Sequence, residues 1–176
     1  MTSFVVHGPF EVDFEKRRGG RTLVTDGFWR EGRDAYNFAW EKGCYVFAMR
    51  NRGLTPIYVG KATKSFKQEV FNKANLHKYH NGFSNYARGT PVMYFAVPQK
   101  AMGPANKSHI GLLEDFLIQA GVAKNPGIQN IKGRQEPKWS IQGVVRSSAR
   151  AKKAEKEFAS LFSIQKSSAP KKKGTK

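Results

Sequence analysis

The chain has almost no cysteine and no long apolar stretch. Cys44 is the only cysteine among 176 residues, which excludes a disulfide within the chain and a cysteine-rich zinc site. No apolar run approaches the roughly 18 residues that a membrane helix needs. The first residues, MTSFVVHGPFEVDFEKRR, lack the charged-then-apolar order of a signal peptide. We therefore expect no membrane partner and a cytoplasmic location.

Acidic residues are also scarce. The chain has 13 Asp and Glu against 31 Lys and Arg, a formal net charge of +18. Residues 146–176 hold 10 basic and 2 acidic residues, so residues 1–145 keep 21 and 11 and remain strongly basic. Such a surplus favours nucleic acid as a partner, through release of counterions from phosphates. A basic surface kept for solubility, or for association with ribosomes, is the alternative.

The hydrophobic content is sufficient for the core of one folded domain with extensions, because 39% of residues are hydrophobic and 12% are aromatic. We divide the chain into an N-terminal elaboration (1–40), a central domain (41–132), a linker (133–145) and a basic C-terminal part (146–176). For the N-terminal elaboration, the sequence predicts one or two strands with a bend at Gly8-Pro9. It predicts a loop at RRGGR. In the C-terminal part we predict a basic amphipathic helix with Ala154, Phe158 and Leu161 on its apolar side, followed by a disordered tail.

The sequence of the central domain predicts a compact α+β fold. CYVFAM and TPIYV, separated by RNRG, indicate a β-hairpin. Phe66, Val70, Ala74 and His77 recur at helical spacing, which predicts one helix from about Ser65 to Tyr79, ended by Asn81-Gly82. A buried strand over Thr90–Val97 follows. Residues 108–122 then predict a second helix with Ile110, Leu113 and Leu117 on one stripe, capped by Ser108 and stopped by Gly121.

The hairpin places two tyrosines and two glycines symmetrically about its turn. In an antiparallel pair, opposed residues have numbers that add to a constant, so if Tyr45 faces Tyr58, Gly43 faces Gly60 and the turn falls between Asn51 and Arg52. Side chains alternate along a strand, which puts these four residues on one face. An ordinary aromatic pair across a hairpin is the structural alternative, and a bulge at Pro56 would shift this register.

Taken in order, these residues resemble the GIY-YIG endonuclease family. Its two tripeptides appear as Gly43-Cys44-Tyr45 and Tyr58-Val59-Gly60, followed by Lys61-Ala62, a helix, a third strand and a helix with Glu114. Asn130 sits where many members have an asparagine that closes the domain. The resemblance covers about residues 41–132. It implies a mostly antiparallel three-stranded sheet flanked by helices, with the N-terminal elaboration and the basic tail added to it.

The resemblance implies metal-dependent hydrolysis of phosphodiester bonds in nucleic acid, with DNA as the expected substrate. Glu114 would hold a divalent cation, Mg²⁺ or Mn²⁺, as a carboxylate suited to a hard ion. Tyr58 or Tyr45 would help to activate water, and His77 would relay protons. For nucleic-acid binding we single out Lys61, Lys64, Lys67, Arg88 and Asn130. Cys44 replaces the usual isoleucine and is expected to be a small core residue.

The sequence departs from the family at one catalytic position. The helix arginine that stabilises negative charge should fall at Gln68 or Glu69, and SFKQEVFNKANLHKY contains no arginine. Lys64, Lys67 or Lys73 could supply a cation, or Arg88 could reach in from a loop, although a lysine does not reproduce the guanidinium fork. Either the site is rearranged, or the domain binds nucleic acid without cutting.

Three functions are therefore weighed: an endonuclease, a catalytically weak or inactive nucleic-acid-binding module of the same fold, and a basic structural protein of a ribonucleoprotein. Opposed tyrosines with Glu114 facing them would favour the first two over the third. Only an assay of cleavage separates the first from the second.

Overall fold

The computed structural model describes residues 2–17, 20–99, 106–130, 132, 150 and 152–161. The chain divides into two compact units, Met1–Arg134 and Gln135–Lys176. Every described strand belongs to the first unit. In the second unit, α4 (Lys153–Leu161) is helical where a helix was predicted, and its described side chains are exposed. The predicted linker and the predicted disordered tail lie outside the described residues.

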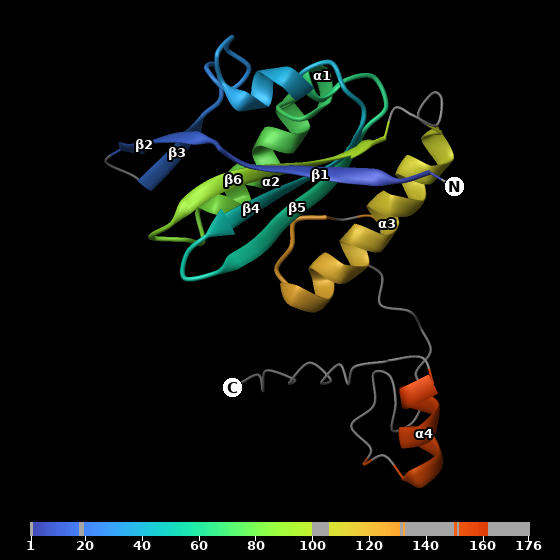
Figure 1. Ribbon diagram of the computed structural model, residues 1–176. Coiled ribbons are helices and arrows are strands. Elements are labelled where there is room, and N and C mark those ends of the chain that lie inside the picture. The colour runs from blue at the N-terminus through green and yellow to red at the C-terminus, as the bar shows by residue number, and fades with distance from the viewer. Residues whose placement is uncertain are drawn as a thin grey trace. The chain divides into compact units, whose positions relative to one another are not determined.

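The first unit is an α+β structure built on an antiparallel sheet of four strands in the order β1-β6-β4-β5 (Figure 1). These strands are β1 (Phe4–Glu11), β4 (Gly43–Arg50), β5 (Leu54–Ala62) and β6 (Thr90–Pro98). The α+β class and the antiparallel pairing are confirmed, but the predicted count of three strands is wrong. The N-terminal segment pairs with β6 and covers the edge that a three-stranded sheet would leave open.

The N-terminal segment bends where the sequence predicted it. The pairing of β1 with β6 is interrupted between His7 and Phe10, around Gly8-Pro9. A separate two-stranded sheet follows, formed by β2 (Asp13–Arg17) and β3 (Gly20–Val24). The predicted RRGGR loop is therefore partly strand, because Arg17 and Gly20 pair with each other across this hairpin. A short 3-10 helix, η1 (Asp34–Phe38), leads toward β4.

The single helix predicted over residues 65–79 is wrong, because the structure has two. They are α1 (Phe66–Glu69) and α2 (Lys73–Phe83). Asn72 has an extended backbone between them, and its side chain accepts a hydrogen bond from the amide of Asn75, which starts a new helix. The second helix continues through Asn81-Gly82. Its buried face therefore contains Asn75 and Tyr79, while Ala74 and His77 are exposed.

The helix α3 (Lys107–Lys124) is longer than predicted at both ends. Asn106 caps it, since its side chain accepts from the amide of Ser108, so Ser108 is inside the helix. Gly121 does not stop it. A Cβ at Gly121 would lie 2.6 Å from Ile128, which shows that this glycine permits close packing of the following segment.

The core lies on both faces of the sheet. On one face, Tyr45, Phe47 and Tyr58 pack with aromatic residues of α1 and α2. On the other face, Val59 packs with Ile118 of α3 and Ile128 beyond it. Figure 1 shows α1 and α2 above the sheet and α3 below it, beside β5. The strand β5 is thus contacted by helices from both sides.

Within the described residues, no helix is both long enough and apolar enough to span a bilayer.

Candidate functional site

The two tyrosines are neighbours, but they do not face each other directly. Tyr45 pairs with Gly60, and Tyr58 pairs with Phe47, so the predicted Tyr45–Tyr58 register is wrong. The cause is an irregularity between Phe47 and Ala48, of the kind that a bulge near Pro56 would produce. Both tyrosines still project from the same face, with ring centroids 6.3 Å apart. They are diagonal neighbours across the hairpin.

The corrected register explains Gly60. The ring of Tyr45 lies across this glycine, and a Cβ there would be 2.4 Å from both Cζ and Oη of Tyr45. The other motif glycine, Gly43, has a φ of +148°, and its Cβ would lie 2.1 Å from the carbonyl oxygen of Ala96. Each glycine is therefore required by a close approach, one to a side chain and one to the backbone.

Tyr45 is buried, with only 2% of its surface exposed. Its hydroxyl accepts a hydrogen bond from Nδ2 of Asn75 at 2.7 Å. Burial raises the pKa of this hydroxyl far above its usual value, and Tyr58, Glu69 and Glu114 act in the same direction. At neutral pH the hydroxyl keeps its proton and is poorly suited to accept another.

Tyr58 has a different environment, although it too is only 8% exposed. Nζ of Lys78 donates to its hydroxyl at 3.2 Å and lies 4.7 Å from the centroid of its ring. This lysine comes from α2, one turn after Asn75. A cation therefore does contact the tyrosine pair, but it comes from the second helix and not from the segment before Asn72.

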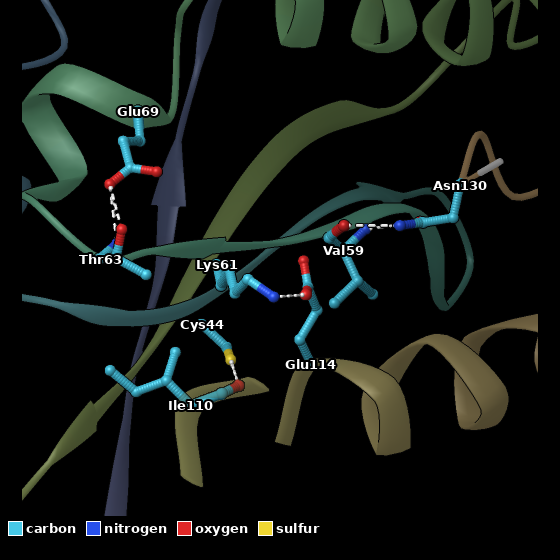
Figure 2. A network of polar contacts seen from close by, with 8 residues as sticks. All are labelled: Cys44, Val59, Lys61, Thr63, Glu69, Ile110, Glu114 and Asn130. Carbon is cyan, nitrogen blue, oxygen red and sulfur yellow. Dashed lines mark hydrogen bonds and ion pairs between the residues drawn. The ribbon is translucent and has the colours of Figure 1, made fainter. Parts of the chain in front are cut away.

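Glu114 of α3 is paired with Lys61 of β5. Figure 2 shows the two side chains pointing toward each other, with Nζ of Lys61 2.8 Å from Oε2 of Glu114. The Glu114 side chain is 17% exposed, whereas Lys61 is largely open to solvent. The hydrogen bond to Glu114 raises the pKa of Lys61 above its usual value. The two residues form a half-buried ion pair near the C-terminal end of β5.

The tyrosines and Glu114 lie on opposite faces of the sheet, and the tyrosines are not directly opposed, so the arrangement that would have favoured a nuclease or a nucleic-acid-binding module over a structural ribonucleoprotein component is not present. Tyr45 and Tyr58 belong to the α1–α2 side, whereas Lys61 alternates with Gly60 and points to α3. Both groups lie at the same end of β5, since Gly60, which pairs with Tyr45, directly precedes Lys61, the partner of Glu114. After burial and the neighbouring Tyr58, the charge of Glu114 makes the smallest contribution to the raised pKa of Tyr45.

Glu114 is the carboxylate that was predicted to hold a divalent cation. Within the part of the chain that the structure describes, no group of three or more His, Cys, Asp and Glu side chains comes together. Mg²⁺ is commonly held by one or two carboxylates, and it takes its remaining ligands from water and substrate phosphates. Glu114 fits this limited role, provided that an ion replaces Lys61 at Oε2.

Two of the other predicted catalytic and binding residues lie apart from this edge. His77 is exposed on α2 and contacts Asn81, four residues further along the same helix. Arg88 is exposed just before β6, at the end of the sheet where Arg50 pairs with Thr90. Lys61 lies near the opposite end, where Cys44 pairs with Ala96. Six residues of strand, about 20 Å, separate these two ends.

Lys64 and Lys67 are exposed and follow β5 directly. The backbone amide of Lys64 donates to Oε1 of Glu69, which also accepts from the amide of Thr63. Nζ of Lys67 lies 4.8 Å from the centroid of the Trp40 ring. Both lysines are thus near the same end of the sheet as Lys61 and are open to a ligand.

Asn130 closes the edge of β5. Its Oδ1 accepts from the amide of Val59 at 2.9 Å, and its Nδ2 donates to the Val59 carbonyl at 2.7 Å (Figure 2). Asn130 is buried. Both ends of its amide are engaged by backbone, which supports a role in closing the domain and gives no support to its predicted contact with nucleic acid.

Cys44 is buried, as expected of a core residue. Its thiol donates to the carbonyl of Ile110 at 3.2 Å and links β4 to α3 (Figure 2). Burial raises the pKa of the thiol to about 12, and the charge of Glu114 adds to the rise.

Sequence reasoning missed Asn75 and Lys78, the two residues that contact the tyrosine hydroxyls. Both fall in NLHKY, inside the segment that was interpreted as a single continuous helix. Asparagine is a favoured residue at helix N-termini. Asn72 could therefore have been taken as the start of a second helix, which would have divided the segment correctly. The second helix would then have begun with Asn75 and Lys78 three residues apart, on one face.

No family model, no curated protein and no solved structure matches this chain.

Proposed function

We propose that the chain is a divergent GIY-YIG protein that hydrolyses phosphodiester bonds in nucleic acid, with DNA as the expected substrate and Mg²⁺ or Mn²⁺ as the cofactor. The observation that carries this proposal is that the tyrosine pair with Lys78 and the half-buried Lys61–Glu114 pair lie on the two faces of one edge strand, next to the consecutive residues Gly60 and Lys61. The net charge of +18 supports an anionic polymer as the substrate.

The residues divide into roles by their surroundings. Glu114 would hold the ion, which when bound supplies a positive charge to the scissile phosphate. Lys61, released from Glu114, would contact a phosphate oxygen from the exposed edge. Of the two tyrosines, Tyr58 is the better candidate to contact the attacking water, since the Tyr45 hydroxyl is deeply buried and holds its proton.

Lys78 is the proposed replacement for the missing helix arginine. Among the described residues, Nζ of Lys78 contacts the Tyr58 hydroxyl, whereas Nζ of Lys67 lies over the Trp40 ring. A lysine gives a point charge and not a bidentate fork, so it stabilises developing charge less specifically. We therefore expect slow cleavage even in the intact protein, and we expect Lys78→Met to reduce it further.

The test compares Glu114→Ala with Asp115→Ala for cleavage of plasmid and branched DNA with Mg²⁺ or Mn²⁺. Glu114→Ala should abolish cleavage, while Asp115→Ala, an exposed neighbour on α3, should cut like the unmodified chain. Stability should change by only about 0–1 kcal/mol, because the lost ion pair is partly solvated. Cleavage by Glu114→Ala at the unmodified rate would show that the active site lies elsewhere.

The second candidate function is binding without cleavage. It is favoured by the burial of Tyr45 and by the ion pair between Lys61 and Glu114, since this carboxylate already has a positively charged partner. In this case Glu114→Ala should leave nucleic-acid affinity intact or raise it, since a repulsive charge is removed, and no variant should cut.

Both candidates require binding that weakens steeply with salt, because several phosphates are neutralised. Removal of residues 146–176 should lower affinity and reduce the salt slope, since this segment carries 10 basic residues against 2 acidic. The measurement is the binding constant of a duplex oligonucleotide between low and physiological ionic strength. A constant that does not depend on salt would contradict both candidates.

A further inference from the structure

Trp40 is the most exposed tryptophan among the described residues. It lies in the turn between η1 and β4, and 64% of its surface is open to solvent. Large aromatic side chains usually bury most of their area, and Trp29, for example, packs against the aromatic core. An exposed indole therefore requires an explanation other than core packing.

The backbone that carries Trp40 is firmly held. The amide of Lys67 donates to the carbonyl of Ala39 at 2.8 Å, and the amide of Phe66 donates to the carbonyl of Glu41 at 2.9 Å. These bonds tie both neighbours of Trp40 to the first turn of α1, and Ala39 also donates to the carbonyl of Tyr36. The ring is presented on a rigid support, which lowers the entropy cost of binding a ligand.

A positive charge lies against this ring, and the adjoining segments carry lysines as well as the acidic residues Glu41 and Glu69. Nζ of Lys67 lies 4.8 Å from the ring centroid, in a cation–π contact over one face. Lys42 and Lys64 are exposed in the two segments that meet at the turn. Glu69, an acidic residue in the same region, is engaged by the amides of Thr63 and Lys64.

The ring lies at the same end of the sheet as the candidate site. Trp40 is three residues before Gly43, which pairs with Ala62, and Ala62 directly follows Lys61. The segment 63–69 that supports Trp40 continues from this strand. A polymer that contacts Lys61 at this end of β5, past the part of the strand that Gln129 and Asn130 cover, would lie near the turn that carries the indole.

We propose that Trp40 stacks on an unpaired nucleobase, while Lys67 and Lys64 contact the adjoining phosphates. This inference rests on the proposed function and deepens it, because it makes single-stranded or unpaired nucleic acid the preferred ligand. Stacking on an aromatic side chain requires a base that is free of its own stack, which duplex interiors do not offer. The combination of one rigid aromatic ring and several lysines is typical of single-strand binding.

An apolar protein partner fits this surface less well. Within segments 39–42 and 63–69, Trp40 is the only large apolar side chain classed as exposed, and the exposed residues around it are lysines and polar groups. A protein-docking patch would be expected to present contiguous apolar area.

The experiment measures the affinity of labelled 12-nucleotide dT, 12-nucleotide rU and a 12-base-pair DNA hairpin, by fluorescence anisotropy without divalent metal. Trp40→Ala should weaken binding of the single strands by about 5- to 150-fold, the range that stacking of one base produces. Binding of the hairpin should change less than about threefold. Trp40→Phe, which keeps an aromatic face, should recover most of the single-strand affinity.

Phe116→Ala is the matched control, since Phe116 on α3 is 66% exposed and lies away from this turn. It should bind all three oligonucleotides like the unmodified chain. The dT and rU arms report whether the base comes from DNA or RNA.

Two outcomes would overturn the inference in different ways. If Trp40→Ala binds single strands as tightly as the unmodified chain, or weakens the hairpin equally, the stacking role is wrong while the proposed function stands. If the unmodified chain binds none of the three oligonucleotides, the proposed function fails as well.

Discussion

Gly60 is the residue around which the candidate site is organised. The aromatic ring of Tyr45 lies across it on one face of β5, and the Lys61–Glu114 pair begins at the next residue on the other face. The glycine therefore has a packing role, because the absence of a side chain leaves room for the Tyr45 ring.

Gly60→Ala should destabilise the fold, because its Cβ would lie 2.4 Å from Tyr45 Cζ and Oη. Forcing this buried ring to move is expected to cost about 1–3 kcal/mol. The measurement is the free energy of unfolding in urea.

Gly53→Ala in the β4–β5 turn is its control, since nothing lies within 4 Å of a Cβ there. It should be neutral or stabilising by up to about 1 kcal/mol, through lower entropy of the unfolded chain. Equal effects of the two substitutions would contradict the packing described for Tyr45.

At the scale of elements, β5 is an edge strand that is closed by segments from other parts of the chain. The segment after α3 runs beside it, where the amide of Gln129 donates to the carbonyl of Ile57 and Asn130 bonds both backbone groups of Val59. This closure protects the strand from pairing with another chain. It also fixes the part of β5 that directly precedes Gly60 and Lys61.

Asn130→Ala should destabilise the unit by about 2–5 kcal/mol, because two buried backbone groups lose their partners. It should also speed hydrogen exchange at the amide of Val59 more than at amides in the middle of the sheet. Native-state hydrogen exchange gives both quantities.

The exposed Asn85 provides the comparison, and Asn85→Ala should change neither quantity measurably. Unchanged exchange at Val59 in Asn130→Ala would show that the side chain does not close the edge.

At the scale of the whole molecule, the first unit buries several groups that can lose a proton. Burial raises the pKa of the Cys44 thiol to about 12 and raises the pKa values of Tyr45 and Tyr79 well above the usual range. Each group is neutral when folded and ionises more easily when the chain is unfolded. The stability that depends on them is complete below their unfolded pKa values and is lost as the pH rises above those values.

We expect the free energy of unfolding to decline above about pH 9, where the unfolded thiol ionises, and more steeply above about pH 10, where unfolded tyrosines also ionise. Each group contributes up to about 1.4 kcal/mol per pH unit. Urea unfolding between pH 7 and 10.5 measures this decline.

Cys44→Ala should remove the part of the decline that begins near pH 9 and leave the part due to the tyrosines. A decline of the same slope in Cys44→Ala would show that the thiol does not contribute.

The sequence alone was sufficient for local features. Alternation and turn composition predicted the β4–β5 hairpin, the strand at Thr90–Val97, the helix carrying Glu114 and the bend at Gly8-Pro9, and each is present. These features depend on the secondary-structure and turn preferences of neighbouring residues, which can be read from one segment alone. The candidate site residues Tyr45, Tyr58, Lys61 and Glu114 were chosen from the resemblance to the GIY-YIG family, and they lie on or beside β4 and β5.

The tertiary structure decided what depends on contacts between segments. A one-residue irregularity between Phe47 and Ala48 set which residues face each other, and the pairing of β1 with β6 set the number of strands. Packing on opposite faces placed Glu114 across the sheet from the tyrosines, and the cap at Asn72 turned Lys78 toward Tyr58. Composition and spacing do not contain this information, because register, face and side-chain reach follow from the packing of distant segments against each other.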